Sequence, residues 1–130
     1  MPTEFSVNLR DEPGTLAHLG GALGDAGVNI EAIAGRSGDG TGRVQFVCDA
    51  PARAAASLAA AGIEYSTREV IVVKVLDEPG TLGDVALIMS EAGINIDSIY
   101  VTTRGHLVLG VDDLDGAIQV AAGMAVMTSS

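Results

Sequence analysis

The residues with the clearest chemical potential lie in a short turn that occurs twice in the chain. The run Asp-Glu-Pro-Gly-Thr-Leu occupies residues 11–16 and returns letter for letter at residues 77–82. Proline fixes φ, and glycine removes the Cβ that would block a close approach to the main chain. A helix that starts after such a turn presents unpaired N–H groups that favour a carboxylate, whereas Asp11 and Asp77 favour an ammonium group. An anion site beside a cation site is complementary to a zwitterion, so the cluster suits a free α-amino acid.

A second motif follows each turn after a helical segment. Ala-Gly-Val-Asn-Ile at residues 26–30 corresponds to Ala-Gly-Ile-Asn-Ile at residues 92–96. Asn29 and Asn95 add carboxamides that can both donate and accept. These residues also have an ordinary structural interpretation, because Pro-Gly forms turns, Asp can bond its own backbone, and Asn after Gly often completes a loop. The residue chemistry leaves both readings open, although the loops agree between the halves better than the helix between them.

The elements that position these loops follow from the spacing of apolar residues. Phe5 and Val7 alternate with polar residues, which is the period of a strand with one buried face. A stripe at helical spacing follows and includes Leu16, Leu19 and Leu23. The first half is therefore predicted to contain a strand at residues 5–10, a helix that starts at the N-cap Thr15 and is closed by Gly27, strands at 28–37 and 43–48 joined by a turn at 38–42, a helix at 51–61 capped by Asp49 and closed by Gly62, and a strand at 63–70.

The second half repeats this pattern with a shorter hairpin. Its predicted elements are a strand at residues 71–76, a helix at 82–92, strands at 94–103 and 106–111, a helix at 114–122 and a short final strand near 124–128. Residues 70–76 are almost uniformly apolar, so the two strands that meet there are not separable by sequence. Each half reads β-α-β-β-α-β, which predicts an α+β fold of two tandem ferredoxin-like units. Each unit is an antiparallel sheet of strand order 4-1-3-2 with helices on one face, and we expect domains at 1–69 and 70–130.

Composition excludes several classes of function. Seven basic residues stand against seventeen acidic ones, and a net charge of -10 repels nucleic acid. No apolar run is long enough to span a membrane, and the N-terminus lacks the basic and apolar regions of a signal peptide, so we expect a cytoplasmic protein. The single Cys48 lies in an apolar run, where a buried thiol is expected rather than a nucleophile.

Other motifs are discounted. The glycine-rich stretch at residues 38–42 joins two strands and lacks the Gly-Lys-Ser/Thr of a phosphate loop. Gly21 and Gly24 lie within a predicted helix, where close helix packing explains them better than nucleotide binding. His18 and His106 are not matched between the halves, so no metal site or cofactor is predicted, although His18 could contact the side chain of a ligand. No nucleophile, base and orienting group form a recognisable set, so no enzyme activity is predicted.

At its two repeated motifs the chain resembles the ACT domain family. Units of this family carry an Asp/Asn-x-Pro-Gly-x-Leu turn between the first strand and first helix, and a Gly-x-Asn-Ile turn after that helix. Both halves match both motifs, and the tandem layout is similar to that of small, stand-alone amino-acid-binding ACT proteins. The resemblance implies that an effector amino acid binds between paired units, held by the Pro-Gly turn of one and the Asn-Ile segment of its neighbour.

Carried over residue by residue, the resemblance implicates twelve positions as ligand-binding residues, six in each half. They are Asp11, Gly14, Thr15, Leu16, Asn29 and Ile30 in the first half, and Asp77, Gly80, Thr81, Leu82, Asn95 and Ile96 in the second. Many relatives carry an attached catalytic domain. We expect no such domain here, so a regulated metabolic enzyme would be contacted in trans.

The sequence therefore predicts a non-catalytic sensor of a small amino acid, with a regulatory subunit that docks on an enzyme without binding a ligand as the alternative. We also expect a homodimer. The predicted open sheet face carries Ser6 and Asn8 in the first half but Val72, Lys74 and Leu76 in the second, an apolar surface that favours a partner. The identity of the amino acid is not specified by the sequence.

Overall fold

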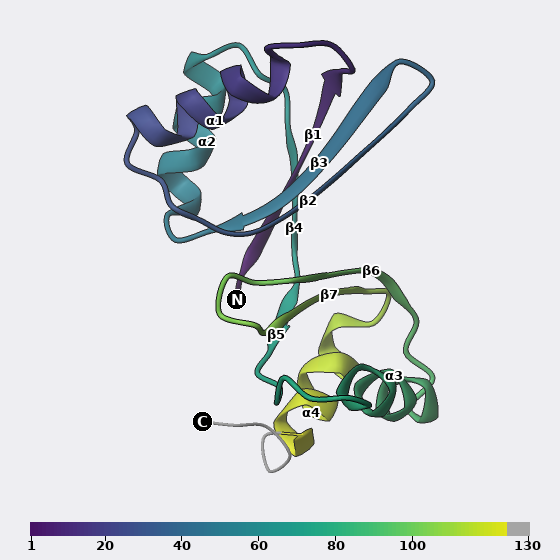
Figure 1. Cartoon of the computed structure of the whole chain (residues 1–130). Helices are drawn as coiled ribbons and strands as arrows, with labels where there is room; N and C mark the ends of the chain where they lie inside the picture. Colours follow the sequence, from purple (N-terminus) through teal and green to yellow (C-terminus); the bar gives the residue numbers. More distant parts are fainter. Residues whose placement is uncertain (125–130) are drawn as a thin grey trace. The chain divides into compact units, whose positions relative to one another are not determined.

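The computed structural model describes residues 1–124, and the chain divides into two compact units (Figure 1). The N-terminal unit is Thr3–Arg68, and the C-terminal unit is Glu69–Ser130 together with Met1–Pro2. Each unit has an antiparallel sheet and two helices within the described residues. The predicted fold class, α+β with two tandem ferredoxin-like units, is confirmed.

The N-terminal unit has the complete six-element pattern. Its elements are β1 (Thr3–Arg10), α1 (Thr15–Asp25), β2 (Ile30–Gly38), β3 (Thr41–Cys48), α2 (Pro51–Ala60) and β4 (Ser66–Glu69). The strand order is β2-β3-β1-β4, the predicted 4-1-3-2, so β2 and β4 are the edges of this sheet. Both helices lie on the same face of the sheet (Figure 1).

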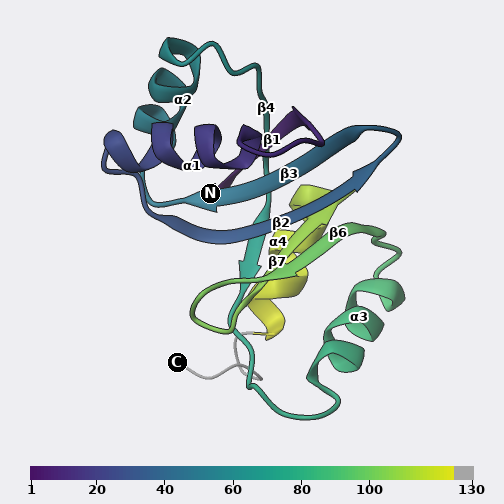
Figure 2. The same ribbon diagram turned by 45° about the horizontal axis from the view of Figure 1, so that its top comes forward.

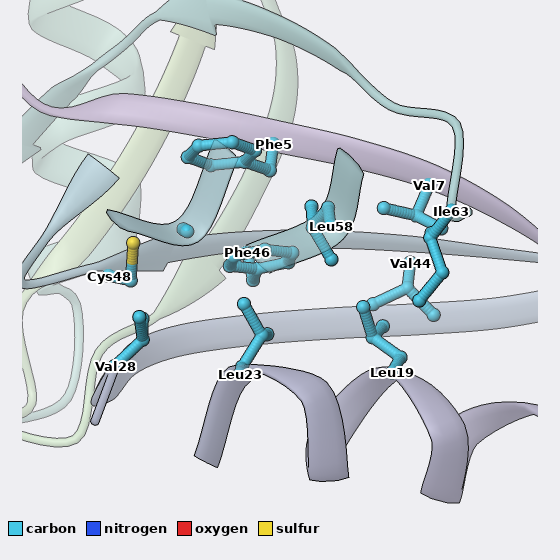
Figure 3. Packing of buried hydrophobic residues seen from close by; sticks show 11 residues of the cluster. Phe5, Val7, Leu19, Leu23, Val28, Val44, Phe46, Cys48, Leu58 and Ile63 are labelled. Carbon is cyan, nitrogen blue, oxygen red and sulfur yellow. The ribbon is translucent and has the colours of Figure 1, made fainter. Parts of the chain in front are cut away.

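The core of this unit lies between that face and the two helices (Figure 3). Phe5 from β1 and Phe46 from β3 stack with their ring centroids 5.0 Å apart, and Leu19 and Leu23 approach them from α1. All four side chains are almost fully buried. Burying a side chain of this size stabilises the folded state by about 1.5 to 3 kcal/mol, so the alternation in β1 and the helical stripe in α1 fix which faces meet.

The C-terminal unit follows the same chain order with shorter strands. Its described elements are β5 (Ile71–Val73), α3 (Thr81–Glu91), β6 (Ile96–Val101), β7 (Leu107–Val111) and α4 (Leu114–Met124). The sheet has the order β5-β7-β6. The final strand was predicted near residues 124–128, but Met124 is the last residue of α4 and residues 125–128 lie outside the described part of the chain.

The junction between the two sheets differs from the prediction. The strand predicted at residues 63–70 begins only at Ser66, because the Ile63 N–H donates to the Leu58 carbonyl at 2.9 Å to close the end of α2, and the Ile63 side chain enters the core. Val70 alone separates β4 from β5, and these strands belong to different sheets. The apolar stretch at residues 70–76 therefore contains β5 alone, and β4 is the polar segment that ends before it.

The hairpin between β2 and β3 is tighter than the predicted five-residue turn. Asp39 and Gly40 form its tip, with φ of 53° and 78°. Two successive left-handed residues give the turn geometry that matches the twist of paired strands. This tip also holds the first repeated turn, because the Asp11 N–H donates to the Gly40 carbonyl at 3.0 Å.

Candidate functional site

The aspartate of each repeated run, Asp11 or Asp77, lies at the apex of a three-residue turn. The Glu12 N–H donates to the Arg10 carbonyl at 2.9 Å, and the Glu78 N–H donates to the Leu76 carbonyl at 3.0 Å. This i to i+2 bond reverses the chain around the intervening residue. Asp11 and Asp77 are both exposed at these apices, so each carboxylate can reach a ligand.

The glycine of each turn is the N-cap residue of the following helix. Gly14 has a φ of 95° and Gly80 a φ of 92°, in the left-handed region that L-residues rarely adopt. A Cβ built on either glycine meets no heavy atom within 4 Å among the described residues. No protein atom of the described residues makes the close approach, so the left-handed backbone conformation is what calls for glycine within the unit, and an approach by a ligand stays a prediction.

Thr15 is the first residue of α1 and does not cap the helix, contrary to the prediction. Its hydroxyl lies 2.7 Å from the Arg10 carbonyl oxygen and 3.1 Å from that of Glu12, so it closes the turn instead. Neither α1 nor α3 has a side-chain cap in the described structure. The N–H groups of the first helical turn are thus not taken by a side-chain cap, and they form a place that favours an anion.

The leucine of the repeated turn is exposed in both units. Leu16 is 58% exposed and Leu82 is 56% exposed, whereas Leu19 and Leu23 are buried. The sequence placed Leu16 on the core stripe, which is wrong because the first turn of α1 lies beyond the core cluster. Each turn therefore combines an exposed carboxylate, an anion-attracting helix start and an exposed aliphatic side chain.

The asparagine motif lies at the other end of the same helix. Asn29 and Asn95 are exposed at the starts of the β2 and β6 segments, and the next residues, Ile30 and Ile96, pack against the two core clusters. An 11-residue helix is about 16 Å long, so the two motifs of one unit are held apart by α1 or α3 (Figure 2). One unit does not bring its predicted site residues together.

A contact at Asn29 was missed by the sequence reasoning. The Asp49 carboxylate accepts a hydrogen bond from the Asn29 N–H at 2.9 Å, and Asp112 does the same for the Asn95 N–H at 3.0 Å. Asp49 was predicted to cap α2, but Ala50 is the N-cap residue, and α2 has no side-chain cap in the described structure. The only sequence signal for this contact was an Asp directly after the third strand in each half.

These paired motifs and the fold that carries them match one known family. The model of the ACT domain pair matches residues 2–124. This chain belongs to the ACT domain pair family. No curated protein matches the sequence.

Solved structures share the fold of this ACT pair at low sequence identity. A Bacteroides thetaiotaomicron protein is 19% identical with a TM-score of 0.87, covering 95% of this chain and 88% of its own. The regulatory subunit of aspartate kinase from Thermus thermophilus is 17% identical with a TM-score of 0.70, covering 94% and 91%. Aspartate kinase from Synechocystis is 18% identical with a TM-score of 0.68, and the match covers 99% of this chain but 26% of that enzyme.

Two side chains of the ACT pair that could be reactive, His18 and Cys48, are engaged in contacts within the fold. The His18 Nε2 lies 3.4 Å from the Ala61 carbonyl oxygen, so the ring contacts the end of α2. Burial raises the pKa of the Cys48 thiol, which keeps it protonated and unreactive. Residues 1–124 contain no group of three side chains suited to hold a metal ion. None of the helices described is both long and apolar enough to span a bilayer.

Proposed function

We propose that this ACT pair is a non-catalytic regulatory protein that binds a free amino acid between two ACT units. The observation that carries the proposal is the duplication of the turn in backbone detail. Both units have the i to i+2 hydrogen bond, the left-handed glycine, the helix start without a side-chain cap and the exposed leucine. The fold alone accounts for the glycine conformation, but it gives no reason for an exposed leucine at the same position of the turn in both units.

Each group of the turn has a role in this proposal. The N–H groups at the start of α1 or α3 receive the ligand carboxylate, with the positive end of the helix dipole behind them. Asp11 or Asp77 accepts hydrogen bonds from the ammonium group. Leu16 or Leu82 contacts the aliphatic part of the ligand, and Asn29 or Asn95 of the facing unit supplies a carboxamide.

The facing unit comes from the same chain or from a second copy. A homodimer remains part of the proposal, since two of the apolar positions that the sequence assigned to the open face, Val72 on β5 and Leu76 beyond it, are half-buried and exposed, and a second copy would cover them. The likeness to the regulatory subunit of an aspartate kinase, over 91% of that chain, supports a role in which ligand binding is passed on to a metabolic enzyme in trans.

A thermal-unfolding screen of the purified protein against the common amino acids tests the proposal. A ligand that binds only the folded state stabilises it by about 2.7 kcal/mol at a hundredfold excess over Kd. We expect a saturable rise in the melting temperature for one amino acid or a small set of related ones. A flat response across all of them at 10 mM would overturn the proposal.

The second candidate is a subunit that docks on an enzyme without binding a ligand. The observation that favours it is the apolar exposure of the C-terminal unit, where Leu87, Ile99 and Val101 are each more than 40% exposed. The same screen separates the candidates, because a pure docking subunit gives no response to any amino acid.

A further inference from the structure

The asparagine of each repeated motif is held by an aspartate in a reciprocal pair of hydrogen bonds. In the N-terminal unit the Asn29 N–H donates to the Asp49 carboxylate at 2.9 Å, and the Asp49 N–H donates to the Asn29 carbonyl at 3.1 Å. In the C-terminal unit Asn95 and Asp112 make the same two bonds at 3.0 and 3.2 Å. Both backbone polar groups of the asparagine are therefore satisfied by one aspartate.

The pairing is kept although the chain between its partners has changed length. Asp49 follows Asn29 by 20 residues, whereas Asp112 follows Asn95 by 17, because the second hairpin is shorter. The offset of the repeated turns would instead match Asp49 with Asp115, which lies in the first turn of α4. The same contact is thus reached through two different hairpins.

A second shared feature fixes the strand on the other side of the asparagine. The pairing of β2 with β3 shifts between Ile30 and Ala32, and the pairing of β6 with β7 shifts between Ile96 and Ser98. Each edge strand therefore carries a bulge one residue after its isoleucine, and bulges commonly re-aim side chains beside functional sites. In both units the asparagine is therefore fixed by its two hydrogen bonds to the aspartate and by the β-bulge that follows it.

We propose that Asp49 and Asp112 are positioning residues for the amino-acid site, and this inference rests on the proposed function. By taking the backbone N–H and carbonyl of the asparagine, each aspartate leaves the exposed carboxamide as the group that meets a ligand. A carboxamide held by its own backbone loses little freedom on binding, which favours affinity. The aspartates act through the asparagines and do not touch the ligand.

Two adjacent aspartates of the C-terminal unit provide a matched test. Asp112 holds Asn95, whereas the Asp113 carboxylate accepts a hydrogen bond from the Gly116 N–H at 3.0 Å and so caps α4. Asp112→Ala and Asp113→Ala each remove one exposed carboxylate and one bond to a backbone N–H. Asp112→Asn keeps an acceptor oxygen at the same place and serves as the conservative rescue.

Three readouts are measured on the full chain: melting temperature, affinity by calorimetry for the amino acid found in the thermal screen, and hydrogen exchange of the Asn95 amide by NMR. We expect Asp112→Ala to speed exchange at Asn95 about tenfold and to weaken binding at the site that Asn95 serves by a similar factor. Asp113→Ala should lower the melting temperature as much while leaving both other readouts unchanged. Asp112→Asn should fall between Asp112→Ala and the parent.

Equal losses of affinity in Asp112→Ala and Asp113→Ala would overturn the positioning role, because general destabilisation would then explain both. Unchanged exchange at Asn95 in Asp112→Ala would overturn it as well. If the parent binds no amino acid, the proposed function fails, and the exchange measurement alone then decides whether Asp112 holds the turn.

Discussion

The Thr15 hydroxyl donates to the Arg10 carbonyl at 2.7 Å and so joins the first residue of α1 to the last residue of β1. This bond spans the whole Pro-Gly turn. Because Arg10 also accepts from the Glu12 N–H, one carbonyl organises both the apex at Asp11 and the start of the helix. The turn is therefore a closed unit at the end of β1, held by its own hydrogen bonds.

Replacing Thr15 with valine should lower the free energy of unfolding by about 0.5 to 1.5 kcal/mol, because valine keeps the shape but loses the hydroxyl donor. Thr15→Ser keeps the donor and should stay close to the parent. Urea unfolding followed by circular dichroism measures both. A valine variant as stable as the parent would show that the bond contributes nothing to the fold.

Gly14→Ala should destabilise the protein by about 1 to 2 kcal/mol, because a left-handed residue with a Cβ is strained even where space is open. Gly20→Ala is the control. Gly20 lies inside α1 with open space around its Cβ, so alanine there should stabilise by roughly 1 kcal/mol. Changes of the same sign in the two variants, measured by thermal unfolding, would contradict the backbone argument.

Ala50→Ser should stabilise α2. Ala50 is the N-cap residue of that helix and has no cap to offer, whereas its counterpart Asp113 caps α4. A serine cap is expected to add about 0.5 to 2 kcal/mol, and Asp113→Ala should remove a similar amount. Calorimetric melting of the two variants checks the pair. No gain from serine would mean that the hydrogen bonds between Asp49 and Asn29 hold the neighbouring Ala50 in a conformation unsuited to capping.

Leu82→Ser should weaken amino-acid binding without weakening the fold. Leu82 and Leu87 lie on the same helix and are 56% and 57% exposed, but only Leu82 belongs to the repeated turn. Each serine variant should change the free energy of unfolding by only about 0.5 kcal/mol. Isothermal titration should show weaker binding for Leu82→Ser alone. Matching losses in both variants would place the exposed leucines in a common docking surface instead.

The sequence predicted the elements that depend on periodic burial. Phe5 and Val7 in β1 and Leu19 and Leu23 in α1 are buried as their spacing indicated, since burial of those faces is the main driving force. Glycine at 27 was also correctly predicted to end α1, and its φ of 70° is the left-handed conformation that such an end requires.

The contacts that shape the candidate site were less predictable, because each depends on two segments far apart in the chain. Asp49 has the sequence context of a helix cap. Only the pairing of β2 with β3 shows that its carboxylate accepts a hydrogen bond from the Asn29 N–H. Leu16 fits the apolar stripe of α1 by spacing, yet the core ends before it. Periodicity describes a face of one element and does not say where the opposing element stops.

Isothermal titration of the amino acid identified by the thermal screen, into the parent and into a variant with Asp11→Ala and Asp77→Ala, tests the central claim most directly. Both carboxylates are exposed turn apices outside the two core clusters of the described residues, so the variant should keep its melting temperature. The account predicts binding to the parent and a loss of about 1 to 3 kcal/mol per site in the variant. Unchanged affinity in a folded variant would contradict the claim that these turns bind the ligand.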